Sequence, residues 1–157
     1  MNSYLKKGVG FGLTSGVITT LSMLIGLSTI SDSRAVVIGG ILSIAIADAA
    51  SDALGMHIAE ESHEKTEEKH IWTATISTFF SKFIFAMTFM VPVALFEIKT
   101  AVIISLIWGF LLLTIFSYKI ALDRKENPVR AVVEHIVIAT VVLTVIHLTG
   151  KLVKTFE

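Results

Sequence analysis

Side chains that could bind a cation recur every four residues within an otherwise apolar stretch of this sequence. Asp48, Asp52, Met56 and Glu60 have this strict spacing, which places them along one side of a helix. An ionised carboxylate at bilayer depth costs about 2.5 kcal/mol or more, so two of them one turn apart need protons, a cation or water. Carboxylates suit hard divalent cations, and a thioether suits a softer one such as Fe²⁺. The pattern predicts a cation path lined by Asp48 and Asp52, with Met56 as an added ligand.

The two aspartates also have a structural interpretation. One of them could be protonated, or both could pair with Lys82 and with hydroxyl groups on other helices. Lys82 lies deep inside a different apolar stretch, where its ammonium cannot easily reach the interface. It could serve as the counter-ion of the aspartates or share an aqueous cavity with them, and the sequence favours neither role.

An acidic segment follows the aspartates. The residues from Glu60 to His70 include five glutamates and two histidines. If the helix continues through this segment, its glutamates fall on one side and could collect divalent cations, a role that we assign to Glu60, Glu61 and Glu64. The alternative is a solvated turn in which acids pair with lysines, such as Glu61 with Lys65.

Long apolar stretches must position these groups. Of the 157 residues, 54% are hydrophobic and only 17% are charged, and the mean hydropathy is +0.78, which is too apolar for an ordinary soluble domain. At about 1.5 Å per residue, each stretch can cross a hydrocarbon core of roughly 30 Å. We therefore expect an all-α, polytopic membrane protein in which residues 1–157 form a single domain of five transmembrane helices, at about 8–30, 35–59, 72–96, 100–118 and 131–150.

The composition excludes several other classes of protein. Thirteen basic and thirteen acidic residues give no net charge, so no basic surface for a nucleic acid is expected. There are no cysteines, which excludes thiolate metal sites and cysteine catalysis. The sequence contains none of the HExxH, GxSxG, P-loop or dinucleotide-binding motifs, and we expect no enzymatic activity.

The distribution of cations predicts the orientation in the membrane. With five spans, eight lysines and arginines fall on the side of the N-terminus and four on the other side, with Lys82 inside the membrane. The positive-inside rule then places the N-terminus in the cytoplasm. The small size and the lack of a targeting extension favour a prokaryotic plasma membrane.

Small residues in the first two spans indicate close helix packing. Gly8, Gly12 and Gly16 form a GxxxG pattern in the first span, and the second span has a stripe of small residues at a spacing of four. Such patterns let helix backbones approach closely in lipid. We expect these two helices to pack tightly together, or to pack across a two-fold axis in a homodimer. The stripe in the second span consists of Gly39, Ser43, Ala47, Ser51, Gly55 and Ala59.

The arrangement resembles the vacuolar iron transporter family, whose members are five-helix proteins. The resemblance rests on the segments Gly12–Thr20, Ser51–His57 and Asn127–Arg130, on Pro92, and on the last span closing with Leu148–Leu152. It implies export of Fe²⁺ or Mn²⁺ from the cytoplasm by proton-coupled dimers, with the metal as substrate and no further cofactor.

The sequence departs from the family pattern at the expected site. Ser15-Gly16 stands where the family has Asp-Gly, so that carboxylate is missing. The family pattern Ser-Met-x-x-Gly-Glu corresponds to residues 51–56, where Asp52 and Met56 exchange the positions of the carboxylate and the thioether. The large cytoplasmic metal-binding insertion of the family is absent, and the short acidic segment takes its place.

Three hypotheses follow from the sequence. In the first, a homodimeric transporter exports a divalent metal: Glu60, Glu61 and Glu64 gather the ion, Asp48, Asp52 and Met56 bind it within the membrane, and protons exchange on the same carboxylates. In the second, the chain is a membrane scaffold or partner subunit that does not transport. In the third, the same ladder of carboxylates carries another cation, such as a proton or a monovalent ion.

Overall fold

The computed structural model describes residues 3–63 and 66–156, and throughout these ranges the regular structure is helical. Five helical segments are long and apolar enough to cross a membrane, which confirms the predicted all-α, five-span architecture. The first, fourth and fifth spans are α1 (Ser3–Ile30), α6 (Ile98–Asp123) and α7 (Pro128–Lys154). The second span is α2 (Arg34–Ser43), the π-helix η1 (Ile44–Asp48) and α3 (Ala49–Glu61), and the third is α4 (Glu68–Thr88) followed by α5 (Met90–Leu95).

Local sequence sets several helix ends. Ser33 caps α2 by accepting a hydrogen bond from the Val36 amide. Asn127 caps α7 and is followed by Pro128, whose fixed φ and missing N–H suit the first helical position. The helices run past the predicted apolar limits at several ends because backbone hydrogen bonding continues into the polar flanks.

The third span is interrupted near Pro92, between α4 and α5. A proline cannot donate to the carbonyl four residues earlier, and its ring clashes with that carbonyl. The residue four positions before Pro92 is Thr88, where α4 ends. The Thr88 hydroxyl donates to the Phe85 carbonyl and accepts a hydrogen bond from the Trp108 indole, so the break is tied to α6.

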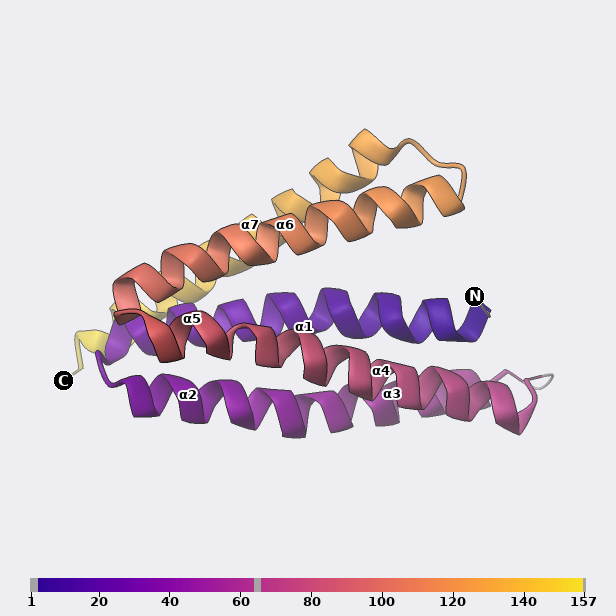
Figure 1. The fold of residues 1–157 in the computed structure, drawn as a ribbon, viewed down its shortest axis with the longest axis horizontal. Helices are drawn as coiled ribbons and strands as arrows, with labels where there is room; N and C mark the ends of the chain where they lie inside the picture. The colour runs from indigo at the N-terminus through magenta and orange to yellow at the C-terminus, as the bar shows by residue number, and fades with distance from the viewer. Residues whose placement is uncertain (1–2, 64–65, 157) are drawn as a thin grey trace.

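Helix α1 lies at the centre of the bundle (Figure 1), with α2, α3 and α4 on one side and α6 and α7 on the other. Leu13, Val17 and Leu21 of α1 are buried in one apolar core with Leu113 of α6 and Leu143 of α7. The α6–α7 pair lies against α1 near the C-terminal end of α1 and separates from it toward the N-terminus. The bundle is therefore closed at one end and wedge-shaped at the other.

The glycines of α1 pack against α4, not against the second span. A Cβ on Gly8 would lie 2.5 Å from the Ala74 carbonyl oxygen, and one on Gly12 would lie 2.6 Å from that of Thr78. Ser81 strengthens the contact by donating a hydrogen bond to the Val9 carbonyl of α1 at 3.0 Å. The expectation that the first two spans pack tightly through their small residues was therefore wrong: the GxxxG pattern predicts a close approach but does not specify the partner helix.

The stripe of small residues in the second span faces outward. All six of its residues, from Gly39 to Ala59, are exposed, and a Cβ on Gly39 or Gly55 would meet nothing within 4 Å. The buried side of this span instead carries Val37, Ile41 and the alanines at 45, 49 and 53. Packing of the stripe across a two-fold axis remains a prediction.

The acidic segment does not continue as a helix. Helix α3 ends at Glu61, and the Ser62 hydroxyl donates to the Ala59 carbonyl. Helix α4 begins only at Glu68, so the predicted continuous helical face of glutamates was wrong. Glu64 and Lys65, with the predicted Glu61–Lys65 pair, lie outside the described residues.

Replacing Gly12 with alanine should weaken the fold. The new Cβ would press on the backbone of α4, and overpacking of this kind costs about 1–3 kcal/mol. Gly10→Ala on the same helix is the matched control, because a Cβ there would meet its nearest neighbours, Ile120 and Phe116, at an ordinary contact distance of 3.6 Å. Reversible unfolding in detergent micelles measures both variants, and equal stability for the two would contradict the assigned α1–α4 contact.

Candidate intramembrane cation site

The ammonium of Lys82 is the centre of a charged cluster in the middle of the bundle. Its Nζ atom donates hydrogen bonds to Asp52 Oδ2 at 2.5 Å and to Ser15 Oγ at 2.9 Å. It also lies 2.6 Å from Asp48 Oδ2, an ion pair without hydrogen-bond geometry. The Ser15 hydroxyl in turn donates to Asp52 Oδ2 at 2.6 Å. Three spans thus meet at one lysine.

Close packing of α1 on α4 allows Lys82 to reach this position. A Cβ on Gly16 would lie 3.2 Å from Lys82 Cγ and 3.1 Å from the Lys82 carbonyl oxygen, so the glycine leaves room for the lysine stem. The next residue toward the N-terminus, Ser15, then supplies a hydroxyl to the ammonium. The sequence shows that Ser15 replaces the family's carboxylate, and the structure shows that this serine is part of the site.

A π-helical turn brings the two aspartates to the same lysine. Residues four apart rotate by roughly 40° per step around an ideal α-helix of 3.6 residues per turn, so a long four-residue repeat drifts off its face. Segment η1, from Ile44 to Asp48, inserts a wider turn and offsets part of this drift. As a result Val37, Ile41 and Ala49 are all buried, while Asp48 and Asp52 both contact Lys82.

The cluster keeps excess negative charge and is partly open. Two carboxylates and one ammonium carry a formal charge of −1. The Lys82 side chain is fully buried, whereas those of Asp48 and Asp52 are 32% and 21% exposed. The geometry matches the interpretation in which both aspartates pair with Lys82, which is their counter-ion. Asp52 also accepts a hydrogen bond from the Ser15 hydroxyl.

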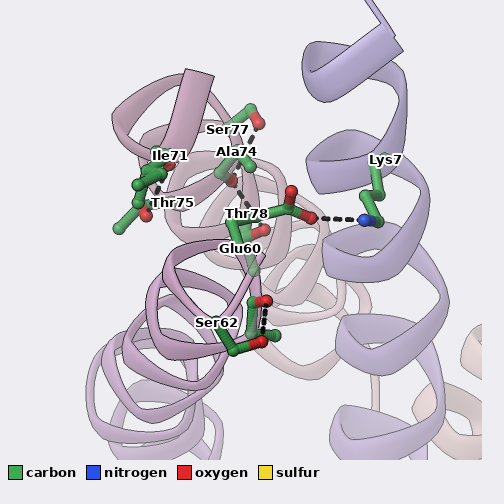
Figure 2. A network of polar contacts seen from close by, with 9 residues as sticks. Lys7, Glu60, Ser62, Ile71, Ala74, Thr75, Ser77 and Thr78 are labelled. Atoms are coloured by element: carbon green, nitrogen blue, oxygen red, sulfur yellow. Dashed lines mark hydrogen bonds and ion pairs between the residues drawn. The ribbon is translucent and has the colours of Figure 1, made fainter. Parts of the chain in front are cut away.

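The other predicted ligands lie elsewhere along the second span. Met56 is buried one turn beyond Asp52, and Glu61 is exposed at the end of α3. Glu60 is 2% exposed and pairs with Lys7 of α1, as Figure 2 shows. Twelve residues of helix separate Glu60 from Asp48, or about 18 Å. Within residues 3–63 and 66–156 no group of three or more His, Cys, Asp or Glu side chains could hold a metal ion.

A cavity of about 880 Å³ occupies the wedge between the N-terminal part of α1, the end of α3 and the end of α6. We name it the N-terminal cavity. Lys7 and Glu60 line it, and so do Lys6 and Asp123, whose ion pair at 2.6 Å links α1 to α6. Its innermost residue on α1 is Thr14. Among the described residues, the two carboxylates that line this cavity are thus each held by a lysine of α1.

A second cavity of about 640 Å³ lies between the C-terminal part of α1, the second span and α7. We name it the C-terminal cavity. Its walls are mainly aliphatic, and Ile18, Thr19 and Asp48 lie at its inner end. Thr14 and Ile18 are four residues apart on one face of α1, so about 6 Å of helix separates the two cavities. Ser15 and its contacts with Lys82 and Asp52 occupy this interval.

Three histidines bind hydroxyl groups of neighbouring helices. His147 hydrogen-bonds to Thr29 at 3.2 Å, His57 to Thr75 at 3.0 Å and His135 to Ser117 at 2.7 Å.

Comparison with protein-family models and with curated proteins finds no match for this chain. A function for this chain therefore has to be inferred from its fold and its charged cluster.

Removing the central lysine, Lys82, should lower the free energy of unfolding. Lys82→Met leaves two partly buried carboxylates without their cation, and breaking a buried ion pair from one side costs about 3–5 kcal/mol. Neutralising the aspartates as well, in Asp48→Asn/Asp52→Asn/Lys82→Met, should recover much of the loss. Lys119→Met is the control, since that lysine is exposed. The free energy of unfolding is measured in detergent micelles. If Lys82→Met leaves it unchanged, the pairing of Lys82 with the aspartates is contradicted.

Proposed function

We propose that this chain is a membrane transporter that moves a divalent metal cation, Fe²⁺ or Mn²⁺, out of the cytoplasm in exchange for protons. The observation that carries the proposal is a cluster of two carboxylates at mid-span with a formal charge of −1 and partly exposed side chains. Intramembrane carboxylates of this kind mark ion and proton pathways. The choice of metal rests on the resemblance to the vacuolar iron transporter family.

The cation would bind at Asp48 and Asp52 by displacing the ammonium of Lys82. When no cation is bound, Lys82 and protons neutralise the carboxylates, which keeps an empty site from being a costly unpaired charge. Ser15 is a further donor in the cluster, and the thioether of Met56 would be another donor one turn further along the span. With the divalent metal on both carboxylates, the site would stay neutral only if two protons leave, the one held by the aspartates and one from the displaced ammonium of Lys82.

The N-terminal cavity would supply the cation. Its two carboxylates, Glu60 and Asp123, face the same space and are held by Lys7 and Lys6. Lys7 is 53% exposed, so a cation in the cavity can replace its ammonium at Glu60. With the N-terminus in the cytoplasm of a prokaryotic cell, this cavity opens to the cytoplasm.

The charge of the cluster favours a second candidate. If Lys82 stays protonated, one positive charge neutralises the site, which suits a proton or a monovalent cation. Competition separates the two candidates: excess monovalent ion suppresses uptake of Mn²⁺ only if it binds the same carboxylates. A chain that takes up no cation would instead act as a membrane scaffold or partner subunit.

We further propose that the outward stripe of the second span forms the interface of a homodimer. Small side chains let helices approach closely, and Gly39 and Gly55 have open space over their Cα atoms. The aspartates lie on the same span, one residue further round than Ala47 and Ser51. A dimer would thus bring two cation sites near its axis.

Asp52→Ala should abolish metal uptake. The purified protein is placed in liposomes and given external Fe²⁺ or Mn²⁺ and a pH gradient. Under the proposed mechanism it takes up the metal only if the carboxylates can bind the cation. Asp32→Ala is the matched control because Asp32 is exposed outside the spans. Unimpaired flux in Asp52→Ala would refute the mechanism, and no flux in the folded native chain would favour the scaffold.

Gly55→Leu should convert the dimer to a monomer. The larger side chain holds the two stripes apart and removes contacts that contribute about 1 kcal/mol or more. Ile107→Ala on α6 is the control, because Ile107 is exposed on another helix. Light scattering in detergent gives the oligomeric state, and a native chain that is monomeric would contradict this interface.

A further inference from the structure

We infer that the C-terminal cavity is filled with water and forms the route by which a cation leaves Asp48. As a release route the inference rests on the proposed function, whereas the hydration of the cavity does not. The cavity extends from Asp48 to Val153 near the end of α7 and to Ile30 at the end of α1. It thus joins the charged cluster to the end of the bundle opposite the N-terminal cavity.

The exposed side chain of Asp48 is the first indication that the cavity holds water. Nearly a third of its side chain is exposed, and it lines the C-terminal cavity. A carboxylate cannot present this much surface to hydrocarbon without a large cost, and charged groups within membranes face protein partners or water-filled cavities. If lipid chains filled the cavity, Asp48 would be in contact with them. Water in the cavity removes this conflict.

A buried hydroxyl oxygen without a partner is the second indication of water. Ser22 Oγ lacks a hydrogen-bond partner among the described residues, and Ser22 lines this cavity. Buried polar atoms of this kind are normally satisfied by ordered water. Thr19, which lines the cavity as well, donates its hydroxyl to the Ser15 carbonyl and keeps lone pairs free to accept from water.

The spacing of the hydroxyl groups along the cavity is the third indication of a route for the cation. Thr19 and Ser22 are one turn apart on α1, and Thr149 of α7 lies at the outer part of the same cavity. These hydroxyl groups form a row between Asp48 and the end of the bundle. A cation that leaves the aspartate exchanges carboxylate for hydroxyl and water oxygens, which are weaker ligands and favour release.

The absence of cysteine from the sequence makes the inference directly testable. Ser22→Cys in intact cells is exposed to a membrane-impermeant methanethiosulfonate, which reacts with the thiolate and therefore needs water at the sulfur. Thr155→Cys lies in the exposed C-terminal end of the chain and reports which side of the membrane this end faces. Ala139→Cys is the buried control, because Ala139 is fully buried in the apolar core, and Val141→Cys is the lipid-facing control.

We expect Ser22→Cys to be labelled from the same side as Thr155→Cys, and about tenfold or more faster than Ala139→Cys or Val141→Cys, because thiols outside water do not ionise. Labelling as slow as in the two controls, or only from the other side of the membrane, would overturn the inference. Rapid labelling in a protein that takes up no metal would support the hydrated cavity and refute the proposed function, so the two failures are distinguishable.

Discussion

The buried ammonium of Lys82 is the constraint on which the rest of the structure depends. A charge at the middle of a span is tolerated only with partners of opposite charge or with water. Lys82 finds two carboxylates on the second span and a hydroxyl on α1. Because these partners come from separate spans, satisfying one ammonium fixes how α1, α4 and the second span lie against each other.

Close backbone packing serves the same constraint. Gly12 and Gly16 let α4 approach α1 so nearly that the stem of Lys82 passes beside Gly16. The π-turn of η1 keeps Asp48 and Asp52 on the side that faces α4. The α6–α7 pair makes no such polar contact with the cluster in the described ranges, and it diverges from α1 where the N-terminal cavity opens (Figure 1).

The sequence predicted the elements more fully than their contacts. The apolar stretches predicted the five spans, because length and hydropathy act locally. Asp48 and Asp52 were identified from their depth and spacing. The partner of the α1 glycines, the π-turn and the bonding of Ser15 depend on which helices meet, and no local pattern encodes that. The separation of Glu60 from the aspartates follows from helix length alone, whereas its pairing with Lys7 does not.

Proton movement coupled to metal binding is the property that the account most directly requires. Liposomes holding the purified chain and a pH-sensitive dye in their lumen receive Mn²⁺ from outside, with an ionophore clamping the membrane potential. We expect the lumen to become alkaline as Mn²⁺ enters, and Asp48→Asn/Asp52→Asn to remove both signals while the exposed-site variant Asp32→Asn retains them. Entry of Mn²⁺ without any change of luminal pH would contradict the exchange of protons at the cluster.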